Sequence, residues 1–214
     1  MNHICHVLYI NLDRRHDRLT QITQELSDVN LLHKSTRISA IDRPDHPCYG
    51  CTLSHLKALK YARDMNYDNV LIVEDDAIFK MTITEINNRL TEFFNTHNSD
   101  YDVLQLASSF VIESSDNFGN NSFRRIVSAS NGAGYIVNKR MYDTLITQFE
   151  KDSELLYHTK AHWLYINDQS WKNLQKLDNV RWYVMKPNII EQRESYSDLA
   201  LCVTNRTNDD KNSI

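Results

Sequence analysis

Short apolar runs rich in β-branched residues alternate with helical segments along most of this sequence, and this alternation restricts its fold more than any other feature. The strand-like runs are residues 6–12, 36–42, 70–73, 102–108 and 181–185, and a further strand leads into a helix within 134–146. Apolar residues recur at helical spacing in 15–26, 51–66, 82–94 and part of 162–177. Such alternation predicts an α/β fold, a mostly parallel sheet flanked by helices on both faces.

The organisation along the chain indicates one domain. Residues 108–128 are rich in Ser and Asn, and we expect a surface excursion there. No internal repeat or low-complexity linker divides the sequence. We therefore predict a single domain over residues 1–200, followed by a polar C-terminal tail over 201–214.

Composition narrows the classes of partner. The chain has 214 residues, 41% of them hydrophobic, which is enough for a sizeable core. Its 24 Lys and Arg against 28 Asp and Glu give a net charge of −4, and the basic residues are scattered, so we expect no nucleic-acid partner. We also expect no transmembrane segment and no signal peptide, hence a cytoplasmic location. Abundant Asn, Ile and Lys are typical of an AT-rich genome, that of a low-GC bacterium or a large DNA virus acting in the host cytoplasm.

The stretch "NVLIVEDDAIF" joins an apolar strand, Val70 to Val73, to three consecutive carboxylates, Glu74, Asp75 and Asp76. Ligands of open α/β sheets bind beyond the carboxyl ends of the strands, where these acids stand. Adjacent carboxylates raise each other's pKa unless a cation or hydrogen-bond donors satisfy them, and oxygen ligands of this kind suit Mg²⁺ or Mn²⁺. The alternative is a solvated acidic turn.

A response-regulator receiver domain is a competing interpretation, because its first strand also ends in paired acids that hold Mg²⁺. The sequence "VMKP", Val184 to Pro187, resembles the Lys–Pro of such domains. Here, however, two strand–helix units precede the acidic strand, and Asp100 and Asp102 come before the next strand rather than after it. The order of elements therefore disfavours a receiver.

The segment "HPCYGCTLSH" contains His46, Cys48, Cys51 and His55, which are residue types found in zinc sites and in redox Cys-x-x-Cys motifs. Structural zinc sites usually draw ligand pairs from separated segments, and four ligands within ten residues would be crowded. A redox motif would follow a thioredoxin-like start, which differs from the pattern here. Buried thiols at the start of a helix are the simpler interpretation.

Several segments, taken in order, closely resemble glycosyltransferase family 25, the group that includes lipooligosaccharide and collagen galactosyltransferases. They are "YINLDRRHDR", "AID", "GCTLSHLKAL", "VLIVEDDAIF", "DVLQL", "GAGYIVNKR", "INDQSW" and "SDL", and they extend from Tyr9 to Leu199. Two positions depart from the family pattern. Arg43 stands where a Gly is typical, and Tyr49 stands where an acidic residue often precedes the Gly–Cys pair.

The resemblance implies a GT-A fold and a hexosyltransferase that moves a sugar from a nucleotide-sugar donor, usually a UDP-sugar, to a hydroxyl of a glycan, glycolipid or protein acceptor. It implies Mn²⁺ or Mg²⁺ as cofactor through an acidic motif of Asp-x-Asp type, here Glu74 to Asp76. It also implies inversion by a single displacement and a role in glycan biosynthesis such as that of lipooligosaccharide. A relative that binds the nucleotide-sugar without transfer remains the alternative.

The resemblance and the strand-end position together give candidate site residues. We expect Asp76 and Glu74 to hold the metal and, because side chains alternate along a strand, Asp75 to face the other way, toward the donor. Asp168 is the candidate general base. Further donor-binding candidates are Ile10, Asn11, Leu12, Arg15, Arg18, Asp42, Ser54 and Lys57, and acceptor-side candidates are Trp171 and Asp198. For Arg15 and Arg18 a role in solvating a helix is the alternative, and for His55 and Trp171 a place in the core. For Asp168 the alternative is an ordinary exposed helix residue, and for Asp198 a turn residue.

Overall fold

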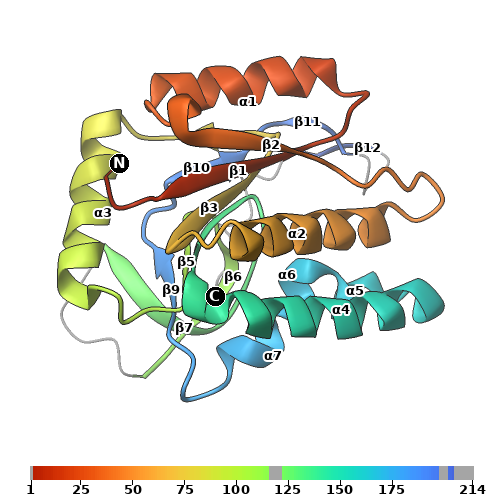
Figure 1. Ribbon diagram of the computed structural model, residues 1–214. Coiled ribbons are helices and arrows are strands. Elements are labelled where there is room, and N and C mark those ends of the chain that lie inside the picture. The colour runs from red at the N-terminus through yellow and green to blue at the C-terminus, as the bar shows by residue number, and fades with distance from the viewer. Residues whose placement is uncertain (1, 116–121, 198–201, 205–214) are drawn as a thin grey trace.

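An eight-stranded sheet forms the centre of the computed structural model, which describes residues 2–115, 122–197 and 202–204 (Figure 1). In spatial order the strands are β2 (Ser35–Ser39), β1 (His6–Asn11), β3 (Asn69–Glu74), β8 (Gly134–Asn138), β5 (Val103–Gln105), β9 (Trp182–Met185), β7 (Phe123–Ser130) and β6 (Ser109–Glu113). Within this sheet, β8 runs antiparallel to β3 and β5, and β7 runs antiparallel to β9 and β6, while the other pairs are parallel. Six of these eight strands thus point the same way and only β7 and β8 oppose them, so the mostly parallel sheet is confirmed, in a mixed form.

Helices cover both faces of the sheet, as predicted. Helices α1 (His16–Asp28) and α3 (Ile83–His97) pack on one face, and α2 (Pro47–Asp64) and α4 (Tyr142–Thr159) lie side by side on the other (Figure 1). Strand β1 shows why both faces need cover, because its successive side chains are apolar on each side. Val7 belongs to the core under α1 and α3, and Leu8 belongs to the core under α2 and α4. Both residues are fully buried, so the strand reads as a continuous apolar run.

The remaining elements are short. Helices η1 (Leu32–Lys34), η2 (Lys139–Met141), α5 (His162–Tyr165), α6 (Asn167–Ser170) and α7 (Lys172–Gln175) connect the larger ones, so the partly helical segment 162–177 is three single turns. Strand β4 (Ala77–Phe79) pairs with β10 (Ile190–Gln192) in an antiparallel ribbon beside the sheet. This ribbon brings residues near position 190 to the acidic cluster that ends β3.

The expected surface excursion over 108–128 is wrong in part. Strands β6 and β7 occupy much of this segment, and β7 joins the main sheet by pairing with β9. Phe123 and Ile126 of this strand are buried in the cores on opposite faces of the sheet, with 5% and 1% of their surface exposed. Arg124 and Arg125, which lie between them, are only partly buried, so this strand has a loop-like polar composition. Residues 116–121 lie outside the described part of the chain.

Part of the predicted C-terminal tail forms a strand. Cys202–Thr204 is β12, which pairs antiparallel with β11 (Ser195–Ser197). Residues 205–214 lie outside the described part. No helix in the described ranges is long and apolar enough to cross a membrane.

Candidate active site

A pocket opens where β1 and β3 end, next to the first turn of α2 and the ribbon strand β10. The residues that line it are Ile10, Asn11, Leu12, Arg14, Arg18, Ala40, Ile41, Asp42, Arg43, Pro44, Pro47, Cys51, Ser54, His55, Glu74, Asp75, Asp76, Gln192 and Arg193. Because β1 and β3 are parallel neighbours, their carboxyl ends meet at the same edge of the sheet. All three acids of the cluster therefore reach one pocket.

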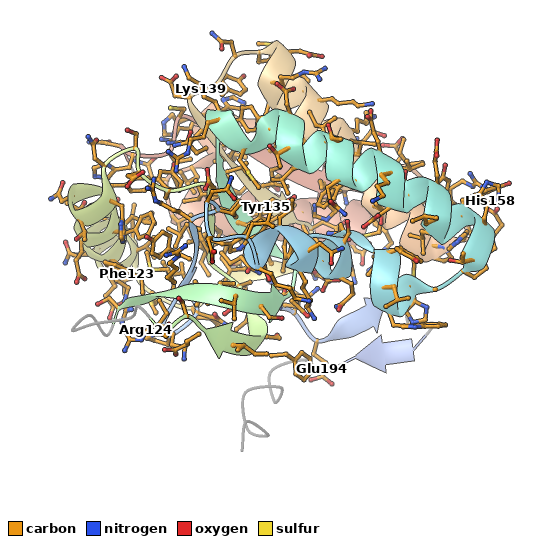
Figure 2. All side chains as sticks on the ribbon, turned by 90° about the horizontal axis from the view of Figure 1, so that it is seen from below. Phe123, Arg124, Tyr135, Lys139, His158 and Glu194 are labelled. Carbon is orange, nitrogen blue, oxygen red and sulfur yellow. The ribbon has the colours of Figure 1, made fainter. Side chains whose placement is uncertain are left out.

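Glu74, the last residue of β3, is held between two side chains from distant parts of the sequence. Its Oε1 lies 3.2 Å from Nε2 of His55, and its Oε2 accepts a hydrogen bond of 3.3 Å from the Gln192 amide. The other ring nitrogen of His55, Nδ1, lies 2.8 Å from the hydroxyl of Tyr135, a residue in the interior of the molecule (Figure 2). His55 is 1% exposed, so the orientation of Glu74 is anchored in the core.

Asp75 points into a buried cluster of donors. Its Oδ2 accepts a hydrogen bond of 2.7 Å from the Asn11 amide, and its Oδ1 accepts one of 2.9 Å from Nη1 of Arg18. Burial raises the pKa of Asp75, whereas the Arg18 guanidinium acts in the opposite direction. Although Asp75 lines the pocket, its carboxylate is already hydrogen-bonded by protein groups.

Asp76 is the acid whose bonding capacity is least used. Its Oδ2 lies 3.4 Å from Nη1 of Arg18, while its Oδ1 is buried without a hydrogen-bond partner among the described residues. The side chain of Gln192, which donates to Glu74, also hydrogen-bonds to Asp76 and lowers its pKa. Burial first, and then the charge of Glu74, raise the pKa of Asp76 to about 7. A buried oxygen in an acidic cluster that opens on a pocket suits a cation.

The alternation expected along 74–76 does not continue past Glu74. Strand β3 ends there and residues 75 and 76 form a turn before β4, so Asp75 and Asp76 both approach Arg18. The period of two that separates opposite faces applies only while the chain stays extended. Asp75 and Asp76 therefore do not face opposite sides.

The other donor-binding candidates divide into two groups. Ile10, Asn11, Leu12, Arg18, Asp42 and Ser54 line the pocket, whereas Arg15 and Lys57 are not among its lining residues. Arg15 pairs with Asp17, and Lys57 donates to the backbone carbonyl of Ser39. The Ser54 hydroxyl donates to the carbonyl of Gly50 and accepts from the amide of Ile41, so it fixes the loop before α2.

Asp168 lies beside the pocket on the short helix α6. Its Oδ2 accepts a hydrogen bond of 3.0 Å from the backbone amide of Asn131, and burial raises its pKa. The preceding residue, Asn167, accepts a 3.6 Å contact from the thiol of Cys51, a pocket residue, which places α6 next to the pocket wall. The structure thus brings Asp168 near the acidic cluster without making it part of the pocket lining.

The two acceptor-side candidates have different positions. Trp171 is fully buried and its indole N–H donates to the carbonyl of Ala129, so it belongs to the core and has no face open to a sugar. Asp198 lies outside the described residues.

Several pocket residues escaped the sequence analysis. Gln192 and Arg193 belong to or follow the three-residue strand β10, too short to give a periodic signal, and the amide of Arg193 donates to the carbonyl of Asp76 over 2.7 Å. Gly132, the first residue of "GAGYIVNKR", was given no role from the sequence, although it lies beside Glu74. A Cβ atom there would lie 2.9 Å from the Asn167 amide nitrogen and 3.4 Å from Glu74 Oε1, so only glycine fits between them without movement.

The Cys/His quartet does not come together as a unit. Cys51 and His55 meet each other and Glu74, with one ligand atom of each within 4.8 Å of the others. His46 instead has its Nε2 3.1 Å from the carbonyl of Leu156, toward the end of α4. A zinc site made of all four residues is therefore excluded by the fold.

The fold is of the GT-A type. Residues 46–157 match glycosyltransferase family 25, described as an LPS biosynthesis protein family, and the chain belongs to that family. The expected family, fold and enzyme class are confirmed. No protein with a curated description matches the sequence.

Two solved structures resemble the chain along nearly its whole length. A glycosyltransferase involved in the glycosylation of the major capsid of PBCV-1 has a TM-score of 0.57 at 9% identity, covering 92% of this chain and 96% of that one. A197 from STIV has a TM-score of 0.50 at 11% identity, covering 94% of each chain. At these identities the likeness shows the fold.

Proposed function

We propose that this enzyme transfers a sugar from a nucleotide-sugar, a UDP-sugar, to a hydroxyl group of a glycan, glycolipid or protein acceptor, with Mn²⁺ or Mg²⁺ bound at the end of β3. The observation that carries this proposal is the buried Oδ1 of Asp76, an oxygen without a hydrogen-bond partner among the described residues in a pocket that also holds Glu74 and Asp75. A cation there would satisfy that oxygen and offset the mutual repulsion of the acids.

Asp76 would ligate the cation, and Glu74 would assist directly or through water. Once bound, the cation would neutralise the negative charge that builds on a departing diphosphate. The contacts of His55 and Gln192 restrict Glu74 before any ligand arrives. Such preorganisation matters because a metal-ligating side chain that is already held in place loses no further conformational freedom when the cation and the donor bind.

The pocket has groups suited to the rest of a nucleotide-sugar. Arg14, Arg43 and Arg193 line it together with Arg18, and guanidinium groups are well matched to phosphate oxygens. Ile10 and Leu12 supply apolar and backbone surface at the end of β1 for a base, and Asp42 lies on the same wall as an acceptor for a ribose or uracil donor. Asp42 accepts a hydrogen bond of 2.8 Å from Nε of Arg14, and a bound donor would have to share or replace this contact.

Asp168 is the proposed general base for the acceptor hydroxyl in a single inverting displacement. Burial raises its pKa and so strengthens it as a proton acceptor, and the amide of Asn131 orients the carboxylate. The acceptor would approach from the α6 side of the pocket, opposite the donor groups of β1.

The test is a thermal-shift screen of nucleotide-sugars with Mn²⁺ and with EDTA, followed by a donor-hydrolysis assay on the ligands that bind. We expect a cation-dependent rise in melting temperature with a UDP-sugar, because a ligand of the folded state stabilises it by mass action. Hydrolysis would distinguish a transferase from a relative that only binds the donor. No stabilisation by any nucleotide-sugar in the presence of Mn²⁺ would overturn the proposal.

A further inference from the structure

Two ligand types of the "HPCYGCTLSH" segment meet a carboxylate inside the pocket. Cys51 and His55 are four residues apart on α2, so they share one face of the helix, and that face meets Glu74 at the end of β3. The thiol sulfur, an imidazole nitrogen and a carboxylate oxygen all lie within 4.8 Å of one another. The spacing is wider than in a metal-bound set, but small side-chain rotations can close it.

We propose that Cys51, His55 and Glu74 form a binding site for a borderline transition-metal ion of the Zn²⁺ type, separate from the hard cation proposed at Asp76. Thiolate and imidazole select ions such as Zn²⁺ and Co²⁺, whereas Mg²⁺ prefers oxygen ligands alone. Three protein ligands leave a four-coordinate ion one position for solvent. All three residues line the pocket, so an ion has a path from solvent to the site.

Neighbouring residues hold the ligands as metal sites require. The Tyr135 hydroxyl lies 2.8 Å from Nδ1 of His55, which turns Nε2 toward Glu74. With an ion on Nε2, the remaining proton would sit on Nδ1 and be donated to Tyr135, the type of outer contact that fixes ligating histidines. The Cys51 thiol now contacts Asn167 over 3.6 Å and would lose its proton to solvent as the metal–sulfur bond forms.

The geometry of Glu74 allows this site to coexist with the cation at Asp76. Its Oε1 faces His55, and its Oε2 is turned toward Gln192, which lies near Asp76 as well. Each oxygen is thus directed to a different set of neighbours. The inference goes beyond the proposed transfer reaction and does not depend on it, because ion binding is measured without nucleotide or acceptor.

The experiment is a titration of the reduced full-length protein with Co²⁺, followed by near-ultraviolet absorption from thiolate-to-cobalt charge transfer. We expect a saturable band in the wild type, its loss in Cys51→Ser, and at least about tenfold weaker Co²⁺ binding in His55→Ala. Cys48→Ser is the matched control, since Cys48 lies on the same helix outside the trio, and it should keep the band. Asp76→Asn should also keep it.

Competition in the wild type needs no variant. Zn²⁺ should abolish the cobalt band, and a large excess of Mg²⁺ should leave it. Circular dichroism would confirm that each variant is folded, and Cys51→Ala would replace Cys51→Ser if the latter were not. The inference would be overturned by a wild type without a saturable band, by a band that survives removal of the Cys51 thiol, or by its loss in Cys48→Ser. None of these results would bear on Mn²⁺-dependent donor binding, and that assay tests the proposed function separately.

Discussion

The guanidinium of Arg18 donates to the carboxylate of Asp75 over 2.9 Å, and the two side chains are only 11% and 9% exposed. Arg18 comes from α1 and Asp75 from the turn after β3, so this pair fastens the first helix to the edge of the sheet where the pocket opens. A buried charge pair of this kind contributes little when complete, but it costs a great deal when one partner is removed.

Arg18→Gln should therefore lower the free energy of unfolding by about 3–5 kcal/mol, because Asp75 would be left charged and buried. The control is Arg63→Gln, since Arg63 forms an exposed pair with Asp64, whose loss should cost far less because water screens the two charges. Urea denaturation of both variants gives the comparison. Equal losses would mean that the Arg18 pair has no special structural role.

Asp76→Asn should stabilise the metal-free protein at pH 8. The pKa of Asp76 is about 7 in the folded state and near its ordinary value of 3.8 when unfolded, so the unfolded chain ionises first. Between about pH 4 and pH 7 Asp76 is ionised in the unfolded chain but protonated in the folded one, so the free energy of unfolding falls as the pH rises. Above about pH 7 both states are ionised and the loss stays constant.

The Asn variant lacks that loss, so its unfolding free energy should exceed that of the wild type by roughly 1–3 kcal/mol at pH 8 and by little at pH 4. Denaturation at both pH values in EDTA measures this difference. If the difference in unfolding free energy between the wild type and Asp76→Asn did not change with pH, Asp76 would not take up a proton on folding.

Gly132→Ala should impair cation binding more than folding. The added methyl group would press on the Asn167 amide at 2.9 Å and crowd Glu74 Oε1 at 3.4 Å, so the carboxylate would have to move. We expect Mn²⁺ affinity to fall about tenfold, as measured by electron paramagnetic resonance of the unbound ion, with a small change in melting temperature.

Gly134→Ala is the informative contrast, because its methyl group would meet Ile190 Cδ1 at 2.5 Å in the core. Overpacking of this kind should lower stability by about 1–3 kcal/mol. If both variants lost stability alike and bound Mn²⁺ normally, Gly132 would have no role at the site.

Asp168→Asn should reduce the rate of sugar transfer by about 10²–10⁴-fold while leaving donor binding intact. An amide oxygen can still accept from the backbone N–H of Asn131, so the side chain should keep its place while losing its basicity. Transfer kinetics and UDP-sugar binding are measured on the same preparation. A variant with full transfer activity would remove Asp168 from the role of base.

Much of the order of strands and helices was predictable because the central strands of this sheet are apolar runs, as Val70 to Val73 illustrates. Strand β7 was not predicted, since Phe123 and Ile126 are separated by half-exposed polar residues. Its place in the sheet depends on pairing with β9, a contact between distant parts of the chain. Periodicity within a short window cannot register such a contact.

The sequence located the acidic cluster at the end of a strand, but it did not predict which way each of the three carboxylates points. The turn after Glu74 brings Asp75 and Asp76 to the same arginine, which a strand period cannot anticipate. Gln192 reaches Glu74 from 118 positions away, and β10, which carries it, has three residues. Contacts of that range arise from the fold as a whole and leave no local signal.

The central claim is that a divalent cation at Asp76 links the acidic cluster to a nucleotide-sugar. Its most direct test is calorimetric titration of UDP into the wild type and into Asp76→Asn, each with Mn²⁺ and with EDTA. The account predicts that Mn²⁺ tightens UDP binding to the wild type by about tenfold or more, a coupling of roughly 1.4 kcal/mol, and that Asp76→Asn removes this gain. Equal UDP affinity with and without Mn²⁺ in the wild type would contradict it.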